Sequence, residues 1–150
     1  MSASRPRKKR VDQINRAKLV EPTLSHEEQM VFNEGITLFN KGKFWHAHES
    51  WERVWLRRSE ESRLFYQGLI QAAAGYHLAV ERPRISGAIR NLEKSLDKLG
   101  LFPSPFLEID VTSLMASIHA AIESLRTNGA SGEEFPRGLI PVLGGRKKPQ

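Results

Sequence analysis

The segment from Phe44 to Arg57, which reads FWHAHESWERVWLR, holds the residues of this chain that are best suited to chemistry. On a helix, residues four apart share a face, so His48 would lie over Glu52, while Glu49 abuts His48 along the chain. An imidazole with two carboxylates could act as a general base and its partner, or as ligands of a metal ion. We therefore expect a polar cluster on this helix.

The elements that must position this cluster are helices, because apolar residues recur at three- and four-residue spacing and no segment alternates as a half-buried strand would. Ser25 and Glu28 form a capping box, and Gly42 suits the end of the first helix. Ser86 is expected to cap a fourth helix, and Asp110 or Thr112 a fifth. The helices predicted are 26–41, 44–57, about 60–82, 86–100 and about 112–126.

These helices predict an all-α fold, a compact antiparallel bundle of about five helices with disordered basic N- and C-terminal tails. The third helix is apolar on most of its faces, which favours the middle of the bundle or contact with a second copy in a homo-oligomer. The predicted division is a basic arm at 1–21, the bundle at 22–127 and a flexible tail at 128–150, whose apolar stretch 138–143 is able to dock on the body.

The net charge of +6 belongs to the ends of the chain. Residues 1–20 hold seven Lys or Arg and one Asp, a net charge of +6. Residues 21–136 hold twelve Lys or Arg and sixteen Asp or Glu (−4), and residues 137–150 hold four Lys or Arg and no acidic residue (+4). The high pI is therefore poor evidence for a nucleic-acid-binding body. The arm, with RPRKKR at residues 5–10, could bind nucleic acid or an acidic partner, or be a solvated tail.

Several classes of protein are excluded or disfavoured by composition. The chain has no cysteine, so disulfides, thiolate metal sites and cysteine nucleophiles are excluded. It has no apolar run of about 18 residues and no secretory signal, and it lacks phosphate-loop, dinucleotide and nucleophile-elbow motifs. We expect a cytoplasmic protein that does not bind membranes.

Three linked motifs resemble a known family. They are KFWHAHESWERVWL at 43–56, FYQGLIQAAAGYHL at 65–78 and Ser-Gly-Ala at 86–88. In this order they resemble the bacterial family known as domain of unknown function 309, over about residues 30 to 100. The resemblance implies a small all-α fold and no assigned activity. The polar and aromatic signature that it implies comprises His48, Glu49, Trp51, Glu52, Trp55, Gln67, Gln71 and His77.

Three interpretations of the polar cluster are open: a buried hydrogen-bond network that fixes helix register, a site for a divalent transition metal, and a pocket for a small ligand. The last two include a metal-dependent or metal-free hydrolase, and an adaptor that acts through the basic arm is a further alternative. The candidate cluster is His48, Glu49, Glu52, Gln67, Gln71 and His77; the candidate aromatic lining is Trp51, Trp55, Phe65 and Tyr76; the candidate metal ligands are His48, Glu52 and His77.

Overall fold

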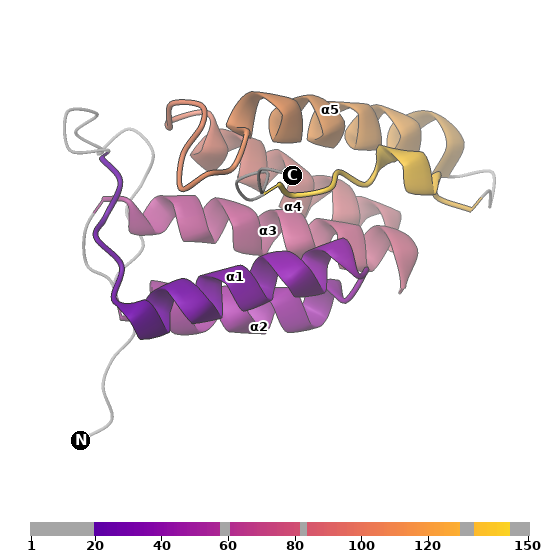
Figure 1. Ribbon diagram of the computed structural model, residues 1–150. Helices are drawn as coiled ribbons and strands as arrows, with labels where there is room; N and C mark the ends of the chain where they lie inside the picture. Colours follow the sequence, from indigo (N-terminus) through magenta and orange to yellow (C-terminus); the bar gives the residue numbers. More distant parts are fainter. Residues whose placement is uncertain (1–19, 58–60, 82–83, 130–133, 145–150) are drawn as a thin grey trace, which may run out of the picture.

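The computed structural model describes residues 20–57, 61–81, 84–129 and 134–144. Within these ranges the chain forms five α-helices and no strand, which confirms the predicted all-α bundle (Figure 1). None of the described helices is long and apolar enough to cross a membrane. The elements are α1 (His26–Asn40), α2 (Phe44–Trp55), α3 (Arg63–Val80), α4 (Ile85–Leu99), α5 (Val111–Asn128) and a 3-10 turn, η4 (Arg137–Leu139).

Local sequence signals set several helix ends as predicted. Ser25 and Glu28 form both bonds of the capping box, at 3.1 Å and 3.0 Å. Gly42 ends the first helix with a φ of 79°, in the left-handed region. Asp110 caps α5, accepting the amide of Ser113 at 3.0 Å, and hydrogen bonds from the Ser113 amide and hydroxyl lower the pKa of this carboxyl.

The predicted start of the fourth helix is wrong by one residue. Helix α4 begins at Ile85, so Ser86 lies inside its first turn, and no side chain caps the helix. The backbone explains the shift, because the amide of Arg84 is bonded to the carbonyl of Leu78 at 2.8 Å and Arg84 is extended. The chain therefore turns into the helix directly after Arg84.

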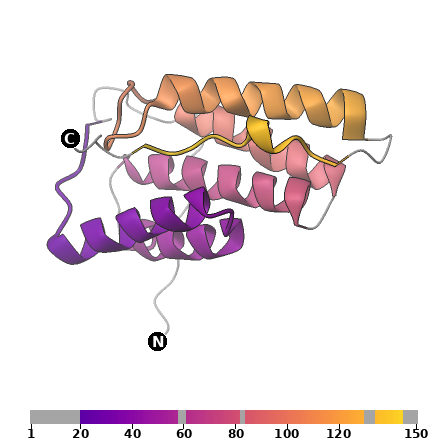
Figure 2. The same ribbon diagram turned by 45° about the vertical axis from the view of Figure 1, so that its right-hand side comes forward.

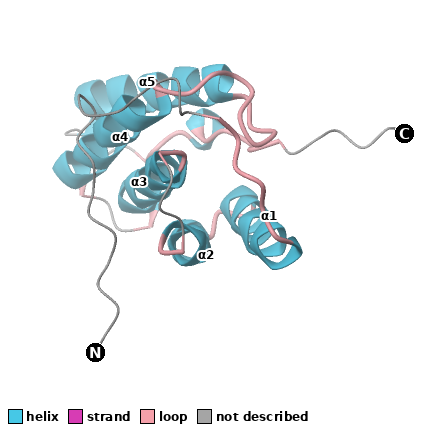
Figure 3. Cartoon of the chain, turned by 90° about the vertical axis from the view of Figure 1, so that its left-hand side faces the viewer, coloured by secondary structure: helices cyan, strands magenta, loops and turns pink. Residues whose placement is uncertain are grey.

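Helix α3 lies in the middle of the bundle, with α2 on one side and α4 on another (Figure 3). Its glycines allow α4 to come close: a Cβ on Gly75 would lie 2.6 Å from Leu92 Cγ, and one on Gly68 would lie 3.0 Å from Leu99 Cγ. The apolar composition and the two glycines of the third helix are thus explained by packing within one chain.

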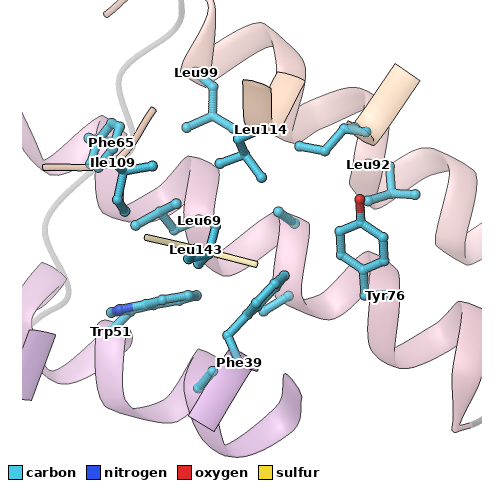
Figure 4. Packing of buried hydrophobic residues seen from close by; sticks show 14 of the residues in the cluster. Phe39, Trp51, Phe65, Leu69, Tyr76, Leu92, Leu99, Ile109, Leu114 and Leu143 are labelled. Carbon is cyan, nitrogen blue, oxygen red and sulfur yellow. The ribbon is translucent and has the colours of Figure 1, made fainter. Parts of the chain in front are cut away.

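Aromatic side chains from α1, α2 and α3 meet in the core (Figure 4). Phe39 contacts Phe44, Trp51 and Tyr76, with ring centroids 5.0 to 6.1 Å apart. The indole of Trp51 donates to the carbonyl oxygen of Phe32 at 3.2 Å, so its polar atom is satisfied inside the core. Burial raises the pKa of the Tyr76 hydroxyl well above its usual value.

Residues 134–144 return along the bundle between α5 and α1 (Figures 1 and 2). Phe135 and Leu143 are buried, and the side-chain amide of Asn40 makes two 2.8 Å bonds to the backbone of Leu143. This segment was predicted to belong to a flexible tail that begins at residue 128, in which residues 138–143 could dock on the body. In the structure, packed residues continue beyond residue 127. Composition could not identify the partner of this segment, because Asn40 lies 103 positions away along the chain.

Candidate functional site

Helix α2 has an inward and an outward face, as the spacing of its residues requires. The inward face packs against α1 and α3, whereas the outward face carries an indole, two carboxylates and a leucine. The buried residues are Phe44, Ala47, Ser50, Trp51, Val54 and Trp55, and the outward stripe is Trp45, Glu49, Glu52 and Leu56.

Trp45 joins the polar residues of α2 and α3. Its indole is 48% exposed and stacks on the imidazole of His48, with centroids 4.8 Å apart and planes at 18°. It also contacts the ring of His77 on α3, at 5.5 Å and 43°. The sequence prediction left Trp45 out of the site, although its spacing of four from Glu49 and seven from Glu52 puts these residues on one stripe.

The predicted histidines and glutamates lie in local pairs along their own helices. His48 Nε2 is 3.3 Å from Glu52 Oε2, and the two side chains are 18% and 27% exposed. His77 Nδ1 is 3.0 Å from the carboxylate of Glu81, a partner that the prediction did not include. His46, also left out of the prediction, contacts Glu49 at 3.5 Å on the exposed surface. The structure connects α2 to α3 here through the Trp45 ring.

Gln67 and Gln71 both lie on α3, and they differ in burial. Gln67 is buried, while Gln71 is partly exposed. The carbonyl oxygen of Gln71 is itself buried and has no hydrogen-bond partner among the residues that the structure describes. A satisfied buried network would bond this oxygen, so the network interpretation does not extend to Gln71.

The metal interpretation requires at least three converging ligands. In the described ranges, no group of three or more His, Asp or Glu side chains is placed to hold a metal ion. His48 and Glu52 form a pair, but His77 is not grouped with them as a third ligand; it pairs with Glu81 instead. The geometry therefore gives the three-ligand metal site no support.

The four aromatic residues predicted as a pocket lining lie in the core. Trp51, Phe65 and Tyr76 have no exposed surface, and Trp55 is 4% exposed. Their contacts are with other core residues, as Figure 4 shows for Trp51, Phe65 and Tyr76. They stabilise the fold, and Trp45 is the aromatic residue of α2 that a ligand can reach.

An open groove of about 550 Å³ follows the outward side of α2 and reaches α1. It contains three carboxylates but one guanidinium, that of Arg53, which lies 3.5 Å from the carboxylate of Glu34. An acidic balance beside an exposed indole suits a cationic group. The groove is lined by Glu34, Leu38, Trp45, His46, His48, Glu49, Ser50, Glu52, Arg53 and Leu56.

Fold and surface together define a small all-α bundle protein with an acidic, tryptophan-bearing groove on its second helix. Residues 32–91 match the model of the family described as domain of unknown function (DUF309). The match confirms the resemblance and runs from Phe32 in α1 to Asn91 in α4, so it includes all of α2. A comparison with curated proteins finds no match.

Proposed function

We propose that this protein is a binding module whose α2 groove recognises a lysine- or arginine-bearing segment of a protein. The single observation that carries the proposal is the outward stripe of α2, in which Glu49 and Glu52 lie between the exposed side chains of Trp45 and Leu56. Carboxylates flanked by apolar surface suit side chains that have an aliphatic stem and a cationic head.

The indole of Trp45 is supported for this role. Tryptophan is the best of the aromatic rings at attracting a cation and is enriched among residues that dominate binding energy. Stacking on His48 restricts the ring before a ligand arrives, and a ring already held in place loses less entropy on binding. The His48–Glu52 pair in turn fixes the imidazole.

The charge of the groove supports a cationic ligand over an anionic one. Glu34, Glu49 and Glu52 line it, and Arg53 offsets one of them. Trp45 and Leu56 are two of the five large apolar side chains that are exposed in the described residues, and they lie on one helix face. Isolated exposed apolar residues are ordinary, but these two line one groove together with its carboxylates, which suits a ligand that has aliphatic and cationic parts.

Fluorescence titration of the full chain tests this function directly. A short peptide of Arg, Lys and Ser should alter the emission of Trp45, and a control peptide with Glu in place of the basic residues should not. The double variant Glu49→Gln, Glu52→Gln should weaken binding by about tenfold, because each exposed ion pair contributes up to about 1 kcal/mol.

The matched control is the double variant Asp97→Asn, Glu123→Gln, which removes two exposed acids from α4 and α5 and leaves α2 intact. It should bind the basic peptide like the parent chain. Equal binding of both peptides, or an equal loss in the two double variants, would overturn the proposed function.

The adaptor and the hydrolase remain alternative predictions. An adaptor acting through residues 5–10 depends on an arm that lies outside the described residues, and it stays a prediction. So does a hydrolase at His48, Glu49 and Glu52, for which the groove offers a histidine–carboxylate pair, while Ser50, which also lines the groove, is 2% exposed.

A further inference from the structure

The groove on α2 and the N-terminal arm have opposite charge. Residues 1–20 sum to +6, whereas residues 21–136 sum to −4. In the groove itself, three carboxylates face one guanidinium. A basic segment tethered to this body is therefore present at a high effective concentration beside an acidic surface.

We infer that the occupant of the α2 groove in the isolated protein is the chain's own basic segment, Arg5–Arg10. This inference rests on the proposed function and names the ligand of that same site. The arm then competes with any external basic partner, so the groove is self-occupied until a tighter partner displaces the arm.

Chain length permits the contact. Arg10 precedes Val20, the first described residue, by ten positions, which span up to about 33 Å when extended. Helix α2 has twelve residues and is about 18 Å long. Its C-terminal end lies beside the start of α1, where Arg57 contacts Glu27 at 3.5 Å. The first described segment runs along this end of the bundle, from the side of α5 down to the start of α1 (Figure 1).

The chemistry of the segment also fits the stripe. The sequence RPRKKR supplies five cationic heads on aliphatic stems within six residues. Glu49 and Glu52 can pair with such heads, while Trp45 and Leu56 can pack against stems or, for Trp45, against a guanidinium face. The absence of apolar residues in the segment predicts weak, salt-sensitive binding that a better partner can displace.

Trp45 is a built-in reporter of this contact. Among the three tryptophans of the chain, Trp51 and Trp55 are 0% and 4% exposed, and Trp45 is 48% exposed. Acrylamide quenching of the full chain therefore measures access to Trp45, and the Trp45→Phe variant should remove the quenchable component.

The decisive comparison is between the full chain and a full-length arm variant in low salt. Quenching of Trp45 should rise about twofold in the arm variant, and the difference should vanish near 1 M salt, where the Debye length is about 3 Å. The arm variant carries Arg5→Ser, Arg7→Ser, Lys8→Ser, Lys9→Ser and Arg10→Ser, and a control carries Arg146→Ser, Lys147→Ser and Lys148→Ser in the other tail.

A second measurement separates this inference from the proposed function. The arm variant should bind the basic peptide several-fold more tightly than the parent chain, because the groove no longer has an internal competitor. If both bind the peptide equally and show equal quenching, the self-occupied groove is wrong and the proposed function stands. If neither binds it, both are wrong.

Protein concentration distinguishes the chain's own arm from the arm of a second copy. Protection of Trp45 that is constant on dilution supports the intramolecular contact. Protection that is lost on dilution at constant salt overturns it.

Discussion

Trp45 and Trp51 lie six positions apart on the same helix, and the structure uses them in opposite ways. Trp51 has no exposed surface, donates its indole hydrogen to Phe32 and packs against Gly35. Trp45 is half exposed, lies between polar residues and contacts the imidazoles of His48 and His77. The inward face of α2 thus stabilises the bundle, and the outward face is available to a ligand.

The difference shows that residue type alone does not mark a site. The conspicuous motif around His48 contains both a core tryptophan and a surface one, and only position on the helix separates them. The following predictions test this division of α2, in order of decreasing expected effect on stability.

Truncation of the two tryptophans to alanine should lower the free energy of unfolding by unequal amounts. Trp51→Ala should lower the free energy of unfolding by about 3–5 kcal/mol, because it leaves a cavity in a packed core. Trp45→Ala should cost about 1 kcal/mol or less, because half of its surface is already in water, yet it should abolish peptide binding. Denaturant unfolding of each variant measures the difference; equal losses would refute the division of α2 into two faces.

The close approach of α1 to Trp51 is the next test. A Cβ on Gly35 would lie 2.6 Å from Cδ1 of Trp51, so Gly35→Ala should destabilise the protein by about 1–3 kcal/mol through overpacking. Gly138→Ala is the matched control, since a Cβ there meets no atom within 4 Å. It should change stability by less than about 0.5 kcal/mol. A tolerated Gly35→Ala would mean that the indole can move aside.

The role of His48 can be separated from that of a surface histidine on the same helix. His48→Ala should cost about 0.5–1 kcal/mol and should increase acrylamide quenching of Trp45, because the stacked ring and the Glu52 contact are lost. His46→Ala, at a 66% exposed side chain, should leave both stability and quenching nearly unchanged. Identical effects of the two substitutions would show that the stack does not position the indole.

The smallest expected effect is at Gln71. Its buried carbonyl oxygen has no hydrogen-bond partner in the described part of the chain, so Gln71→Leu should be neutral or stabilise the protein by up to about 1 kcal/mol. Thermal unfolding measures this change. A loss of more than about 1 kcal/mol would show that the amide makes a bond that matters and would restore the buried-network interpretation.

Local signals made the helices predictable. The capping box at Ser25, the left-handed Gly42 and the cap at Asp110 each involve residues within a few positions of one another. Such contacts depend mainly on residues that are close in sequence, which is why these helix ends could be predicted. The start of α4 was wrong because a backbone bond from Arg84 to Leu78, invisible in the local pattern, sets it.

The candidate site was predictable only in part. Spacing placed His48 beside Glu52, and the structure has this pair at 3.3 Å. The sequence spacing did not predict that His77 pairs with Glu81 and also contacts the ring of Trp45. The contact with Trp45 depends on how α2 and α3 pack. Trp45 was left out of the predicted site, although its spacing from Glu49 and Glu52 places it on their side of the helix.

The sequence by itself determined the helical class, the helix positions to within a few residues, the family resemblance and the pairing of His48 with Glu52. Only the tertiary structure decided which stripe faces water, that the predicted aromatic lining is core, and that residues 134–144 return to bond Asn40. The physical reason is the separation in sequence of the residues that interact. Periodicity and caps involve residues within about four positions of one another, whereas burial depends on segments that are distant along the chain.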